Sequence, residues 1–239
     1  MSIEELYEKE TFTREEYYLS LQGERGELTE DALSYLLRKE VENGEIIHIG
    51  RDQYAFRNGK HVYEYDYSEL ASKVASDILK EYPDADFRIF ELVQMNQFVN
   101  HQIAHNTVFV YVENDLVDYV FDTLRQDYQG RILLKPSVKE YYRYLVEDEI
   151  VILRLPSETP KGEGKPWRSR LEKVLVDICA DKLLSNIISD SEYEEIYDEA
   201  FRRYYVDVKA MMRYARRKGA YDRYRKFLKT YAPDIVERT

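Results

Sequence analysis

The sequence has very little cysteine, which excludes several kinds of site. Its 239 residues include a single cysteine, Cys179, so the chain can form neither an internal disulfide nor a zinc site built from several cysteines. Cys179 lies in the apolar pattern Leu-Val-Asp-Ile-Cys, where a thiol usually serves as a small buried hydrophobic group. We therefore do not expect this cysteine to act as a nucleophile.

Long hydrophobic runs are also missing. The longest uninterrupted apolar run spans residues 108–112, far short of the roughly 20 residues that a membrane-spanning helix needs. The opening residues, Met-Ser-Ile-Glu-Glu, have neither the basic start nor the apolar stretch of a signal peptide. These absences predict a soluble, cytoplasmic protein without a membrane partner.

Motifs for catalysis and cofactor binding are missing as well. The sequence contains no Gly-rich phosphate loop and no serine elbow. Four central carboxylates, Glu91, Glu113, Asp115 and Asp118, are of the residue type that assembles a metal-dependent nuclease or nucleotidyltransferase centre. Glu113 lacks the nearby lysine that a restriction-type nuclease places after its acid. We therefore predict no catalytic residue and no cofactor, and keep a cryptic metal-dependent enzyme as an alternative.

A histidine pair offers a weaker signal for a metal. His101 and His105 are four residues apart, a spacing that places two ligands on one face of a helix and can serve zinc. No glutamate lies between them to act as a base, and no third ligand can be identified. We therefore predict no metal site.

Charge is unevenly distributed along a chain whose net charge is −11. Residues 1–60 carry 8 basic and 14 acidic groups, residues 61–199 carry 15 and 28, and residues 200–239 carry 12 and 4. A basic end on an acidic body indicates either an anionic partner for that end or an electrostatic contact with the acidic remainder of the chain. Both possibilities remain open from the sequence.

Residues 1–60 have the pattern of a winged helix-turn-helix. Two short helices are predicted between residues 3 and 21, the second opening with a capping box formed by Thr13 and Glu16. Thr29 precedes a third helix with apolar residues at helical spacing. Residues 45–49 and 53–56 then read as two strands around a tight turn.

Residues 61–239 are predicted to form a mixed α/β domain with a helical C-terminal end. Helices and strands alternate in its first half, which is typical of a sheet covered by helices. The expected helices span 68–82 and 115–128, and the expected strands span 87–92, 107–113, 132–134 and 150–155. A polar loop at 156–166 precedes four expected helices at 168–187, 190–204, 207–218 and 220–231. The overall fold class is therefore α/β of the α+β kind, with two domains.

A winged helix normally places its third helix in the DNA major groove. Basic and polar side chains on that helix, in the wing and in the basic C-terminal end are therefore the candidate contacts to bases and phosphates. Acidic Glu30 and Asp31 lie at the end of the helix that usually approaches DNA, where they repel phosphate. The candidate DNA-binding residues are Ser34, Tyr35, Arg38, Lys39, Arg51, Arg57, Arg213, Arg216 and Arg217.

Two segments resemble the abortive-infection type IV antitoxin family, the AbiEi-like transcriptional regulators. They are Leu171-Glu-Lys-Val-Leu-Val-Asp177 and Tyr205-Val-Asp-Val-Lys-Ala-Met-Met-Arg-Tyr-Ala-Arg-Arg-Lys218, and both follow the winged helix and the strand Val110-Tyr-Val-Glu113. The resemblance covers nearly the whole chain. It implies a regulator that binds its own promoter and opposes a nucleotidyltransferase-type toxin without forming a stable complex with it.

The sequence thus predicts a non-enzymatic antitoxin of a toxin-antitoxin system in phage defence, which regulates transcription from its own promoter. The negative charge of residues 1–60 favours an alternative in which the winged helix binds proteins and not DNA. The third possibility is the cryptic nuclease or nucleotidyltransferase with Glu113 and Asp115 at its centre.

Overall fold

The computed structural model describes residues 2–7, 9, 11–26, 28–57, 60–99, 101–162, 164–233 and 235. The chain divides into two compact units. The first comprises Met1–Tyr63 and Phe201–Asp207, and the second comprises Glu64–Ala200 and Val208–Thr239. Both helices and strands are present, so the mixed α/β class predicted from the sequence is confirmed.

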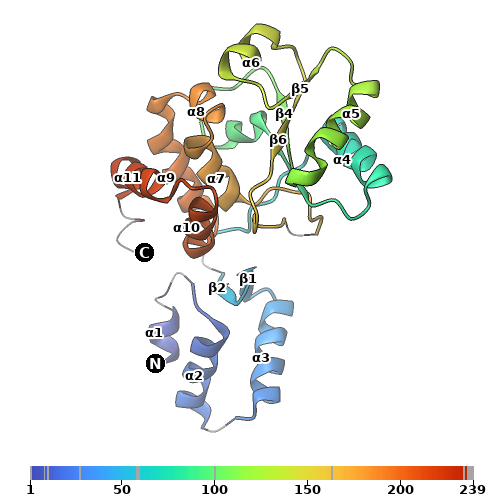
Figure 1. The fold of residues 1–239 in the computed structure, drawn as a ribbon. Coiled ribbons are helices and arrows are strands. Elements are labelled where there is room, and N and C mark those ends of the chain that lie inside the picture. Colours follow the sequence, from blue (N-terminus) through green and yellow to red (C-terminus); the bar gives the residue numbers. More distant parts are fainter. Residues whose placement is uncertain are drawn as a thin grey trace. The chain divides into compact units, whose positions relative to one another are not determined.

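Three helices and a hairpin make up the N-terminal part of the first unit (Figure 1). The helices are α1 (Ile3–Tyr7), α2 (Arg14–Arg25) and α3 (Glu30–Glu42), and the hairpin consists of β1 (Ile46–Gly50) and antiparallel β2 (Gln53–Phe56). Thr13 and Glu16 form the expected capping box at α2, and the Thr29 hydroxyl accepts the Ala32 amide at the start of α3. These local predictions are confirmed, whereas the winged-helix interpretation stays a prediction.

Residues 201–207 complete the core of the first unit, although they are distant from it in sequence. A β-bridge joins His61 to Tyr204, and the amide of Tyr205 donates to the carbonyl of His61 at 3.0 Å. The Tyr205 ring is buried with Ile49 and Ala55 of the hairpin. The hairpin therefore packs against a segment that lies between two C-terminal helices, which the sequence did not indicate.

A four-stranded sheet forms the centre of the second unit, with strand order β3-β4-β6-β5. Its strands are β3 (Phe87–Glu91), β4 (Thr107–Val112), β5 (Ile132–Leu134) and β6 (Glu149–Arg154). β3 pairs with β4 in antiparallel fashion, and β6 pairs with both β4 and β5 in parallel. Parallel neighbours need crossover connections, which α5 (Val117–Asp127) and α6 (Val138–Tyr144) supply.

One face of this sheet packs against α4 (Glu69–Glu81) and α5 (Figure 1). Side chains alternate between the faces of a strand, so Val110 of β4 and Ile152 of β6 point to the same side and are fully buried. They join Val74 of α4 and Val120 of α5 in one hydrophobic core. The Ser68 hydroxyl accepts the Ala71 amide at the start of α4, as predicted.

The opposite face of the sheet packs against α6 and α7 (Leu171–Ala180). The Tyr141 ring of α6 stacks on Phe109 of β4 with ring centroids 6.5 Å apart. The ammonium of Lys173 in α7 lies 3.4 Å from the ring centroid of Tyr111 in β4. Both faces of the sheet are therefore buried, which agrees with the nearly continuous apolar sequence of β4.

The C-terminal end is helical, as predicted. Beyond α7 it contains α8 (Leu184–Ile187), α9 (Tyr193–Arg203), α10 (Val208–Arg217) and α11 (Tyr221–Tyr231). The short 3-10 helices η1 (Leu92–Gln97), η2 (Asn114–Leu116) and η3 (Asp190–Glu192) complete the described elements. The single helix expected over 168–187 is wrong, because α7 ends at Ala180 and the Asp181 carboxylate accepts the Leu183 amide in the turn before α8. No helix among the described residues is long and apolar enough to cross a membrane.

Candidate nucleic-acid interface

The outward side of α3 carries a row of exposed side chains. Leu33 and Leu37 are buried in the first unit, while Tyr35, Arg38 and Lys39 are exposed, Tyr35 to 63%. Positions three and four apart lie on one side of a helix, so these three side chains form a single row. Neither Arg38 nor Lys39 makes an ion pair with any residue that the structure describes.

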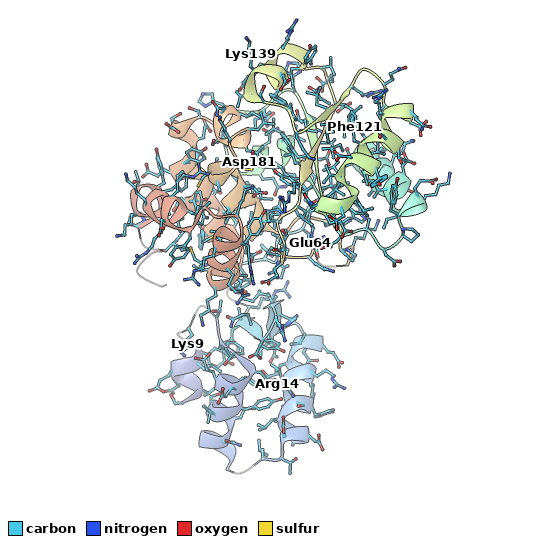
Figure 2. The ribbon with its side chains drawn as sticks, viewed as in Figure 1. Lys9, Arg14, Glu64, Phe121, Lys139 and Asp181 are labelled. Carbon is cyan, nitrogen blue, oxygen red and sulfur yellow. The ribbon has the colours of Figure 1, made fainter. Side chains whose placement is uncertain are left out.

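Ser34, also predicted to contact DNA, is engaged inside the first unit. Its hydroxyl accepts a hydrogen bond from the Arg14 guanidinium at 2.6 Å and lies 2.8 Å from the Tyr18 hydroxyl. Arg14 also donates to Tyr18 at 2.6 Å, and Tyr18 raises the pKa of the guanidinium further. Figure 2 shows Arg14 between α2 and α3. Ser34 therefore helps to hold α2 against α3. Its hydroxyl already has two hydrogen-bonding neighbours, Arg14 and Tyr18.

Arg14 is the basic residue on this side of the unit that the sequence analysis missed. It is the first residue of α2, its side chain is exposed, and its amide donates to the Asp52 carboxylate in the hairpin turn at 3.2 Å. Its position beside α3 depends on how α2, α3 and the turn pack together. The only signal in the sequence was a basic residue directly after an N-cap.

The two predicted wing residues flank the hairpin. Arg51 lies in the turn, where Asp52 adopts a left-handed conformation (φ 56°), and its side chain is exposed. Arg57 follows β2, and its guanidinium lies beside Gly44 at the end of α3. The structure therefore brings Arg57 to the C-terminal end of α3, the end nearest Arg38 and Lys39, which are in its last turns.

Acidic side chains surround the basic row on α3. Glu30 and Asp31 occupy the first turn and are exposed, and Glu42 follows Arg38 by four positions on the same side. Carboxylates in the first turn stabilise the helix through its dipole but repel a phosphate backbone. The first turn of α3 is therefore acidic, whereas its C-terminal half carries Arg38 and Lys39 together with Glu42.

The three predicted arginines of α10 differ in their surroundings. Arg217 forms an ion pair with Glu158, and the Arg216 guanidinium lies 4.3 Å from the ring centroid of Tyr221. Arg213 is exposed and makes no ion pair with a described residue. Arg213 and Arg216 are therefore more available to bind an anion than Arg217. Arg217 would first have to release Glu158.

α11 adds further cations, which belong to the predicted basic C-terminal end but were not among the predicted DNA-binding residues. Arg225, Lys226 and Lys229 are exposed and lie on one side of the helix because they are spaced three, four and seven positions after Asp222. Arg223 differs, since its guanidinium donates to the carbonyl of Ala180 at the end of α7. The exposed positive charge of the second unit thus extends from α10 to α11.

Lys218 closes the basic run in sequence but belongs to a buried ion network. The Asp177 carboxylate accepts hydrogen bonds from Lys173 at 2.6 Å, Lys218 at 2.5 Å and Tyr214 at 3.0 Å. Burial lowers the pKa of Lys173 to about 8, and Asp177 opposes that shift. Burial acts to raise the pKa of Asp177, but the two lysines lower it overall. The network joins α7 to α10.

The histidines and carboxylates considered as metal or catalytic groups are dispersed. His101 and His105 lie in a non-helical segment, and they contact Glu192 at 3.1 Å and Glu147 at 2.7 Å respectively. The shared helical face that their spacing suggested is therefore wrong. Within the described ranges, no group of three or more His, Cys, Asp or Glu side chains is arranged to hold a metal ion.

The central carboxylates each have separate roles. The Glu113 carboxylate accepts the amide of Asp86 at 2.8 Å, Asp115 contacts its neighbour Asn114, and Asp118 pairs with Lys135. Each of these three groups is engaged with a different part of the second unit.

A family model described as "Family of unknown function (DUF6577)" matches residues 32–234. The match begins within α3 and ends beyond α11, so it includes most of both compact units. No curated protein matches the sequence.

Proposed function

We propose that this chain, which belongs to the DUF6577 family, is a cytoplasmic, antitoxin-like transcriptional regulator that binds its own promoter DNA. The observation that carries the proposal is the exposed row of Tyr35, Arg38 and Lys39 on α3. This row lies on the third helix of a unit in which a hairpin follows three helices, the order of elements in a winged helix-turn-helix.

In this proposal, basic side chains and one tyrosine contact the DNA. Arg38 and Lys39, with Arg57 at the same end of α3 and Arg51 in the hairpin turn, bind the phosphate backbone and base edges. Tyr35 supplies an aromatic face and a hydroxyl on the same side of the helix. Ser34 instead helps to hold α3 through Arg14 and Tyr18. On the second unit, Arg213 and Arg216 of α10 are proposed to bind phosphate as a surface of their own.

Opposition to a toxin is the second part of the proposal and comes from the resemblance to the AbiEi-like antitoxins. The first quoted segment lies in α7, and the second contains all of α10. Hydrogen bonds from Tyr214 and Lys218 to Asp177 join them, which supports a common structural role for the residues that carry the resemblance. The proposed partner is a nucleotidyltransferase-type toxin, opposed without a stable complex.

DNA binding is tested by fluorescence anisotropy on a labelled duplex taken from the region upstream of the coding sequence. Each phosphate contact contributes about −0.9 to the slope of log affinity against log salt concentration. We expect the double variant Arg38→Ala/Lys39→Ala to weaken binding and to flatten the slope by about 1.8, the loss of two contacts.

The matched control is Lys139→Ala, which removes one exposed positive charge from α6 in the second unit (Figure 2). It should leave both affinity and slope unchanged. The control removes one charge and the α3 variant removes two, so a loss in the control about half as large as that in the α3 variant would mean that only net charge matters. An unchanged affinity in the α3 variant would place the interface elsewhere and favour a winged helix that binds proteins.

The antitoxin activity is tested by coexpression with a nucleotidyltransferase encoded next to this chain. The full chain should restore growth to cells that express the toxin. If growth is not restored at matched protein levels, the antitoxin part of the proposal fails while the DNA-binding part stands on its own measurement.

A further inference from the structure

A group of exposed apolar side chains lies where α6 ends and the chain turns into β6 (Figure 1). Tyr142, Tyr144, Leu145 and Val146 are each between 36% and 52% exposed. These four make up almost half of the large apolar side chains that are exposed among the described residues. Single exposed apolar residues are ordinary, whereas a contiguous group marks an interaction surface.

Packing within the second unit holds the start of this stretch in place. Tyr141, the residue before it, is buried against Phe109 of β4, and its hydroxyl oxygen lies 2.8 Å from that of Thr107. The Tyr142 hydroxyl donates to the carbonyl of Asn186 in α8 at 3.0 Å. A surface that is ordered before a partner arrives loses less entropy when the partner binds.

The turn that follows α6 is held in place as well. The Val146 amide donates to the carboxylate of Glu149, which is buried at the start of β6. His105 contacts one carboxylate oxygen of Glu147 at 2.7 Å. Glu147 itself is exposed, so its other carboxylate oxygen can bind a cation from outside the chain.

Charge around this stretch is close to balanced, although the whole chain has a net charge of −11. Between residues 139 and 148, the cations Lys139 and Arg143 stand against the anions Glu140, Glu147 and Asp148. Two copies of a strongly acidic chain repel one another. They therefore approach most readily through a surface on which the charges nearly cancel.

The order of residues 143–147 makes the stretch complementary to itself. Leu145 stands at its centre, Tyr144 and Val146 flank it, and Arg143 and Glu147 occupy the two ends. In a two-fold dimer, residue i of one copy contacts residue j of the other, and j contacts i. Two antiparallel copies of this stretch would bring Arg143 beside Glu147 and Tyr144 beside Val146, with the leucines at the two-fold axis. Each charged end then meets the opposite charge.

We propose that residues 142–147 form a homodimer interface, with a second copy of this chain as the partner. Apolar side chains supply its centre and the two Arg143–Glu147 pairs its rim, and both tyrosine and arginine are enriched in protein interfaces. Each half-exposed tyrosine offers roughly 100 Å², half of what an aromatic side chain can bury. The interface is therefore small, and we expect dimerisation in the micromolar range or weaker. The inference goes beyond promoter binding and does not depend on it.

Sedimentation velocity of the full chain, from micromolar to sub-millimolar concentration, tests the proposal. The unmodified chain should shift from monomer to dimer as its concentration rises. Leu145→Glu places two carboxylates at the two-fold axis and should weaken dimerisation at least about ten-fold. Tyr119→Glu adds the same charge at an exposed position of α5, on the opposite face of the sheet, and is the control that should dimerise normally.

A charge exchange tests the contact between the two copies. Arg143→Glu and Glu147→Arg should each weaken dimerisation about five-fold, because each variant sets like charges side by side. The double variant Arg143→Glu/Glu147→Arg restores opposite charges and should dimerise nearly as well as the unmodified chain. Both variants with Glu147→Arg lose the contact with His105, so recovery in the double variant reports on the contact between copies. Both positions are exposed, and circular dichroism should show that every variant folds.

A chain that stays monomeric over the whole concentration range would overturn the proposal and leave this stretch as a contact surface for a different protein. A dimer that Leu145→Glu leaves intact, or that Tyr119→Glu weakens to the same extent, would also overturn it, because the contact would then lie elsewhere or depend only on net charge. Failure of the double variant to recover would refute the antiparallel contact between Arg143 and Glu147.

Discussion

A buried carboxyl group in β6 makes the stability of the second unit depend on pH. Glu149 is 1% exposed, lies opposite Thr107 in the β4–β6 pair, and has one carboxylate oxygen without a partner among the described residues. Burial raises its pKa from 4.5 to about 7, against the effect of the Val146 amide. The folded unit therefore binds this proton more tightly than the unfolded chain does.

The sign of the effect follows from that order of pKa values. The contribution of Glu149 to the stability of the folded unit is fully present below the unfolded pKa of 4.5. It is lost as pH rises through the folded pKa of about 7. Each pKa unit corresponds to about 1.4 kcal/mol, so the shift sets an upper limit of roughly 3.4 kcal/mol. Glu149→Gln, which cannot ionise, should raise the free energy of unfolding by about 2–3 kcal/mol at pH 8 and change it little at pH 4.

The assay is urea unfolding followed by the fluorescence of Trp167, which is buried in the core of the second unit and therefore reports on that unit. Glu81→Gln, at an exposed position near the end of α4, is the control and should show no comparable gain. A gain of equal size at both pH values, or a loss of stability at pH 8, would refute the reasoning.

Two further substitutions test buried contacts. Tyr205→Phe removes the buried hydrogen bond, 2.6 Å long, from the tyrosine hydroxyl to the carbonyl of Phe56. The loss should destabilise the hairpin by about 1–2 kcal/mol. The hairpin amides should then exchange hydrogen faster, and an unchanged exchange rate would contradict the prediction. Lys173→Met should lower the urea midpoint of the second unit, but by less than Asp177→Asn, which leaves two buried ammonium groups without their carboxylate. The reverse order would show that the network is not held by Asp177.

Short-range signals in the sequence predicted most of the elements. Thr13, Thr29 and Ser68 each cap a helix where expected, because an N-cap depends on residues within one turn. Helix α6 was missed although Ser137 and Glu140 form a capping box at its start. Its 7 residues give too few turns for a clear apolar period.

Long-range contacts were not predictable in the same way. Ser34 is engaged by Arg14, 20 positions away, and Tyr205 reaches a carbonyl 149 positions away. Arg217 and Lys218 are adjacent in a basic run, yet one contacts Glu158 at the surface and the other is largely buried against Asp177. Charge and spacing identified the basic segments, whereas availability of each cation depends on tertiary packing.

The most direct test of promoter recognition is a competition gel shift with the full chain, its own upstream DNA and a shuffled sequence of equal length, at about 50 and 200 mM salt. The proposed function predicts that the upstream DNA is retained against excess shuffled DNA, and that binding to both weakens as salt rises. Equal competition by the shuffled sequence, or no binding at either salt concentration, would contradict it.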